Sequence, residues 1–104
     1  MYMPEIFETL KQQYPDIVDS YQKVGELCAN AGPLDEKNRH LIQLGIAIGI
    51  SSRGAVRSHA RRALEAGATE KEVVQAVLLA MPIIGFPATV GAYEWIRSVL
   101  VDEA

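Results

Sequence analysis

The chain has 104 residues, of which 49% are hydrophobic and 7% aromatic, and it carries a net charge of −3 at pH 7. A chain of this length predicts one domain, residues 1–104. The negative charge and the dispersed basic residues argue against a nucleic-acid partner and against a membrane-surface role. The single cysteine cannot form an internal disulfide, and no signal-peptide pattern is present, so we expect a cytoplasmic protein.

Helical periodicity runs along the whole chain, and no stretch shows the convincing alternation of a strand. We therefore predict an all-α fold of about six helices. Pro4 is suited to open a first helix, which Pro15 then ends. The N-terminal helix would thus lie within residues 1–15, and the core would span about residues 16–101.

The next three helices are predicted from their ends and their apolar sides. In the second, Cys28 is expected to be a small buried side chain. Asp35 can cap the third helix, which is apolar almost all round over residues 41–50 and should be buried on most sides. Ser51 or Ser52 is expected to cap the fourth helix, and Gly67 is expected to end it.

The sequence Thr69-Glu-Lys-Glu72 is a capping box, which predicts that a fifth helix starts there. We expect residues 82–87, PIIGFP, to form an apolar connector that can wall a pocket, with a last helix over about residues 88–101. The aliphatic surplus exceeds what one small domain can hide, so we predict a homo-oligomer.

Two histidines are the candidate functional groups. His59 lies on a stripe of small and apolar residues in the fourth helix. If the third and fourth helices pair about Ser51, then His40 and His59 differ in height by only about 5 Å and can face each other. Ser52 is about 10 Å from His59 along the same helix, which makes a direct Ser-His dyad unlikely to form. The alternative is that each histidine is a separately satisfied core group.

Three stretches carry a family resemblance. They are GPLDEKNRHLIQLGIAIGISS, then HARRALEAGATEKEVVQAV beginning at His59, then GFPA from Gly85. Together they resemble the carboxymuconolactone decarboxylase family, which includes the alkylhydroperoxidase D-like proteins. The resemblance covers roughly residues 20–100. It implies an all-α helical bundle that assembles into trimers or hexamers, with sites near subunit contacts.

The redox branch of that family uses a Cys-x-x-Cys pair, a histidine and an upstream glutamate. The matching positions here are Ser52 and Ala55 for the cysteines, His59 for the histidine and His40 for the glutamate. Because thiolate chemistry requires sulfur, we do not expect dithiol peroxidase activity. Cys28 lies outside the motif.

The lactone decarboxylase branch does not need the dithiol, and resemblance to it implies a lyase acting on a small organic acid. His59 or His40 would be the acid/base, with Ser52 as a further catalytic candidate. Arg53 or Arg57 would anchor the carboxylate, although these arginines can equally form a solvated face or an intersubunit salt bridge. Phe86, in the GFPA motif, is the third substrate-binding candidate.

No cofactor or metal site is expected from these motifs, since two histidines alone are too few for a zinc site. Two alternatives remain beside the lyase. One is an alkylhydroperoxidase-like antioxidant relative, of the peroxiredoxin type, whose activity is lost or altered. The other is a non-catalytic oligomeric helical protein.

Overall fold

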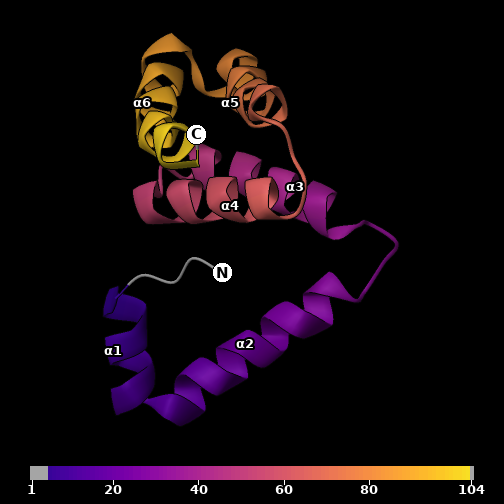
Figure 1. Ribbon diagram of the computed structural model, residues 1–104, viewed down its shortest axis with the longest axis vertical. Coiled ribbons are helices and arrows are strands. Elements are labelled where there is room, and N and C mark those ends of the chain that lie inside the picture. Colours follow the sequence, from indigo (N-terminus) through magenta and orange to yellow (C-terminus); the bar gives the residue numbers. More distant parts are fainter. Residues whose placement is uncertain (1–4, 104) are drawn as a thin grey trace.

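The structure, a computed structural model, describes residues 5–103, which form six helices and no strand (Figure 1). The prediction of an all-α fold of about six helices is confirmed. The expected helix start at Pro4 lies outside the described residues. In chain order the helices are α1 (Glu5–Gln13), α2 (Pro15–Ala29), α3 (Glu36–Gly49), α4 (Arg53–Glu65), α5 (Glu70–Ile84) and α6 (Phe86–Glu103).

The helices form two parts, a bundle of α3 to α6 and an arm of α1 and α2 that stands apart from it (Figure 1). In the bundle, α3 packs along α4 and α5, and α6 packs against α4 and α5. The core is aliphatic and alanine-rich, as the composition predicted. Its fully buried larger members are Leu44, Ile48, Val56, Val73, Val77, Ile96 and Val99. No helix within residues 5–103 has both the length and the apolarity needed to cross a membrane.

The prediction that Cys28 is buried is wrong, because this side chain is exposed on α2. Pro15 is the first residue of that helix, as suits a residue without a backbone N–H. The apolar side of α2 was expected to pack on the core, but only Val18 is buried in that helix. The cause is the position of the arm, which contacts the bundle little in the single chain (Figure 1).

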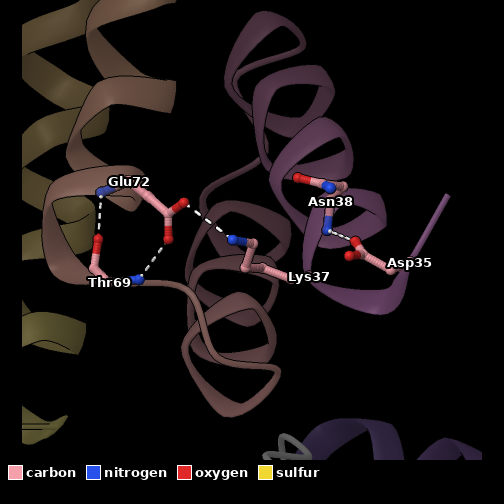
Figure 2. Close-up of polar contacts among 5 residues, drawn as sticks. All are labelled: Asp35, Lys37, Asn38, Thr69 and Glu72. Atoms are coloured by element: carbon pink, nitrogen blue, oxygen red, sulfur yellow. Dashed lines mark hydrogen bonds and ion pairs between the residues drawn. The ribbon is translucent and has the colours of Figure 1, made fainter.

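The first turns of α3 and α5 are both capped and lie next to each other (Figure 2). Asp35 Oδ1 accepts a hydrogen bond of 2.9 Å from the Asn38 backbone. Thr69 and Glu72 form the predicted capping box, with reciprocal bonds of 3.1 and 2.9 Å. The Lys37 ammonium donates to Glu72 Oε2 at 3.1 Å and so ties α3 to α5. The Thr69 backbone bond and Lys37 both lower the pKa of Glu72.

Replacing Thr69 by alanine is expected to lower the free energy of unfolding by about 1 kcal/mol, because an N–H of the first turn of α5 loses its acceptor. Urea unfolding followed by circular dichroism measures this loss. Thr69→Ser keeps the hydroxyl and serves as the control. Equal stability of the alanine and serine variants would show that the box contributes nothing here.

The ends of α4 follow the sequence signals. Ser52 occupies the N-cap position of α4, although its side chain makes no capping hydrogen bond. Gly67 has φ of +103°, which favours glycine, and it terminates the helix. The Ala68 N–H donates to the Ala63 carbonyl at 2.9 Å and the Gly67 N–H donates to the Leu64 carbonyl at 3.1 Å. These two bonds are a Schellman motif, which turns the chain toward α5.

The predicted connector over residues 82–87 is wrong. Helix α5 continues through Pro82 to Ile84, and α6 begins at Phe86. Pro82 lies near the helix end, where the missing N–H costs one intrahelical bond. Gly85 alone makes the break, with φ of +91°.

Candidate functional site

The two histidines face each other across α3 and α4. His40 Nδ1 lies 3.3 Å from His59 Nδ1, and the ring centroids are 5.5 Å apart. The prediction from equal heights on paired helices is thus confirmed. The His40 side chain is only 15% exposed, and His59 is half-buried. Two basic nitrogens therefore meet in a poorly solvated place.

Burial and nearby cations keep both imidazoles neutral. Burial, then Arg62 and then His40 together lower the pKa of His59 to about 4. Burial also lowers the pKa of His40, again with help from Arg62, while Glu36 opposes this shift. A neutral pair can form one N–H···N hydrogen bond, whereas two imidazolium rings would place two N–H donors against each other.

Either ring can donate in the Nδ1···Nδ1 contact, depending on its tautomer. With the proton of His40 on Nε2, which lies 4.0 Å from a carboxylate oxygen of Glu36, His59 Nδ1–H donates to His40 Nδ1 and His59 Nε2 carries the free lone pair. This tautomer offers a neutral base at His59, oriented by His40.

Comparisons with known proteins place this geometry in a family. The sequence pattern of the Carboxymuconolactone decarboxylase family matches residues 15–98 of the chain. The chain belongs to this family. The match contains both histidines and all helices except α1 and the end of α6.

Three uncharacterized proteins match this carboxymuconolactone decarboxylase family chain in sequence, over between about half and nearly all of their length. An uncharacterized protein of Haemophilus influenzae is 35% identical over 57 residues, which is 55% of this chain and 50% of that protein. Two uncharacterized proteins of Methanocaldococcus jannaschii are 24% identical over 99 residues and 26% identical over 89 residues. The first match covers 95% of this chain and 92% of that protein, and the second covers 85% and 86%.

A crystal structure of a carboxymuconolactone decarboxylase family protein from Legionella pneumophila has the same fold. The TM-score is 0.76 at 20% identity, with 86% of this chain and 80% of that chain covered. Identity this low shows the fold alone.

The other candidate residues of this family member lie away from the histidine pair or at its margin. Ser52, at the start of α4, is seven residues from His59, about 10 Å along the helix and beyond hydrogen-bond reach. Arg53 and Arg57 project from other sides of α4, because two and six residues do not return a helix to the same face. Phe86 is exposed at the start of α6.

Sequence reasoning missed Arg62 and underused Glu36. Arg62 follows His59 by three residues and acts on both imidazoles. Its Nε atom is buried and has no hydrogen-bond partner. Glu36 precedes His40 by four residues and was not among the candidate site residues. In both cases the helical spacing of three or four residues was the signal that was available.

An apolar groove lies away from the histidines. It has a volume of about 640 Å³ and runs between α3 and α5. Neither His40 nor His59 lines this groove, whereas Ile83 and Ile84 of the expected 82–87 connector do. Among residues 5–100, no group of three or more His, Cys, Asp or Glu side chains could hold a metal ion.

Proposed function

We propose that this chain is a dithiol-independent lyase of its family, in which His59 acts as an acid/base on a small organic acid. The observations that carry the proposal are the 3.3 Å contact between His59 Nδ1 and His40 Nδ1 and the burial that, with Arg62 and His40, lowers the pKa of His59 to about 4 and so favours a neutral ring near pH 7. A neutral imidazole is the usual general base near pH 7.

In a decarboxylation, the bond from the substrate's carboxylate to its neighbouring carbon breaks, CO₂ leaves, and the electron pair remains on the carbon side as an enolate. His59 Nε2 takes a proton from water and delivers it to that carbon, so the imidazole ends neutral as it began and one proton is consumed from solvent. During the step His40 accepts from the His59 Nδ1–H and stabilises the imidazolium, as an orienting partner does in other acid/base pairs.

Arg62 is the cation best placed to hold the substrate's carboxylate. It is half-buried on α4 with Nε unpartnered, and its charge already acts on both rings. Arg53 and Arg57, the residues proposed from the sequence, remain the second choice. They lie on other sides of the helix, and although Arg57 also has a buried Nε without a hydrogen-bond partner, neither residue is among the charges that act on the two rings.

Release of CO₂ from a panel of small cyclic lactone acids tests the proposal. His59→Gln should reduce turnover about 100-fold or more, as expected for loss of a general base. Cys28→Ser, on the exposed side of α2, should turn over like the parent. Decarboxylation that survives His59→Gln unchanged would remove His59 from the chemistry.

Hydroperoxide reduction with a dithiol reductant should be absent in the parent chain. The only sulfur of a cysteine is that of Cys28, and it lies on the arm, whereas Ser52 and Ala55 occupy the positions of the dithiol. Cys28→Ser should give the same near-zero rate. Robust peroxide turnover in the parent that is lost in Cys28→Ser would favour the antioxidant alternative instead.

We also propose that the chain is a homo-oligomer, a trimer or hexamer, because large apolar side chains remain exposed on most of its helices. Multi-angle light scattering at micromolar concentration measures the mass. A stable monomer at that concentration would contradict the proposal.

A further inference from the structure

The arm formed by α1 and α2 presents an apolar stripe that nothing in its own chain covers. Ile17, Tyr21 and Val24 are 65%, 67% and 57% exposed. Cys28 is exposed as well. Steps of four, three and four residues put all four side chains on one face of α2.

Such an arm is not stable by itself. Helices α1 and α2 have 9 and 15 residues, and isolated helices of this length are marginal in water. Their mutual contact buries only Val18 among the residues of α2. The arm therefore needs a surface to pack on.

The size of the missing contact follows from the accessible surface. The chain exposes 6945 Å², whereas a compact protein of its mass exposes about 5,800 Å². The Cα radius of gyration is 14.2 Å, against about 12.9 Å for a compact chain of this length. The excess of about 1,100 Å² is larger than the ~800 Å² that each partner buries in a standard interface.

The groove between α3 and α5 is the complementary surface. It is lined almost entirely by aliphatic side chains and glycines, with Asn38, Gln75 and Glu72 as its polar members. Ile46 and Ile83 are 60% and 84% exposed along it. At about 1.5 Å per residue, α3 and α5 give it walls of about 21 and 22 Å, which match the length of α2.

Net charge favours association of the arm with the bundle as a whole. Residues 1–30 carry five acidic and two basic side chains, whereas residues 31–100 carry six acidic and eight basic ones. The arm is thus acidic and the bundle basic, which favours their association. Each chain has one arm and one groove. If each copy places its arm in the groove of another, the apolar surface of every arm and every groove is buried.

We infer that the arm of one chain packs its Ile17–Cys28 stripe into the α3/α5 groove of a second copy. The inference rests on the proposed self-association and names the surfaces that produce it. It is independent of the histidine chemistry.

Disulfide trapping between two kinds of chain tests the inference. One chain keeps Cys28 as its single cysteine. The other carries Cys28→Ser with one new cysteine in the groove, Ile42→Cys, Ile46→Cys or Ile83→Cys, so that any orientation of α2 is sampled. After co-refolding and mild oxidation, at least one groove variant should give a linked heterodimer on a non-reducing gel, because a disulfide requires Cα atoms within about 7 Å. Ser98→Cys, exposed on α6, is the matched control.

The outcomes separate the inference from self-association itself. No linked dimer above the Ser98→Cys control in any groove variant overturns it, even if light scattering shows an oligomer. An intrachain disulfide without dimer, in a chain carrying both Cys28 and Ile46→Cys, also overturns it, since the arm would then fold on its own groove. Val24→Asp should lower the oligomer mass at least twofold, and Ser98→Asp should leave it unchanged. A Val24→Asp mass equal to that of the parent contradicts the inference.

Discussion

Replacing Leu44 by alanine is expected to lower the free energy of unfolding by about 3–4 kcal/mol, within the range for buried leucines. Leu44 is 0% exposed in the middle of α3, the helix that packs on both α4 and α5. The substitution removes the apolar contacts of the side chain and leaves a cavity that a close-packed core cannot fill by collapse. Urea unfolding at a fixed protein concentration measures the loss.

Leu78→Ala is the matched control, because it makes the same chemical change on the exposed side of α5. This variant should lose less than about 1 kcal/mol, as surface substitutions generally do. A small domain has only about 5–15 kcal/mol of stability in total. The urea concentration at which half of the protein is unfolded should therefore be clearly lower for Leu44→Ala than for the parent. Similar losses in the two variants would mean that α3 is not the centre of the folding unit.

Helix ends were predictable from sequence wherever a local hydrogen bond determines them. Asp35, Thr69 with Glu72, and Gly67 each act through residues at most four positions away. Such signals need no knowledge of the tertiary structure. They placed the start of α3, the end of α4 and the start of α5.

Pro82 and the arm show where local reasoning fails. Proline was interpreted as the start of a connector, but its cost depends on its place within the helix, and near the end of α5 the cost is one hydrogen bond. The burial of Cys28 was inferred from periodicity, which identifies an apolar face but not the surface that covers it. In the single chain that face of α2 has no cover.

The candidate site, too, was predictable from the sequence only in part. The axial rise per residue fixed the equal heights of His40 and His59, and the 3.3 Å contact confirms it. The spacing of three residues between His59 and Arg62 was available from the sequence. The effect of Arg62 on His40 depends on how α3 packs on α4, which periodicity does not give, so that effect emerged only from the structure.

Titration of His59 by NMR is expected to show a pKa of about 4, far below the ordinary value of 6.5. Between these two pH values the unfolded chain binds a proton on His59 that the folded chain does not. The folded state is therefore most favoured above pH 6.5, and this advantage is lost as the pH falls from 6.5 towards about 4. Because the rings interact, the two apparent pKa values belong to the pair.

Arg62→Met should raise the pKa of both histidines, and this joint response is the sharpest test of the site. Burial is the largest cause of both low values and is retained in the variant, so neither ring should return fully to 6.5. Loss of the guanidinium removes the second cause, because a nearby positive charge disfavours the imidazolium. Methionine keeps an unbranched apolar side chain at this position and so limits repacking.

Arg97→Met is the matched control, since Arg97 is exposed on α6 and contacts the Tyr93 ring at 5.9 Å. It should leave both titrations as in the parent. A shift of one histidine alone in Arg62→Met would mean that Arg62 acts on a single ring and that the pair does not titrate as a unit. No shift in either ring would remove Arg62 as a carboxylate anchor, because a cation too remote to affect the imidazoles is too remote to hold a substrate between them.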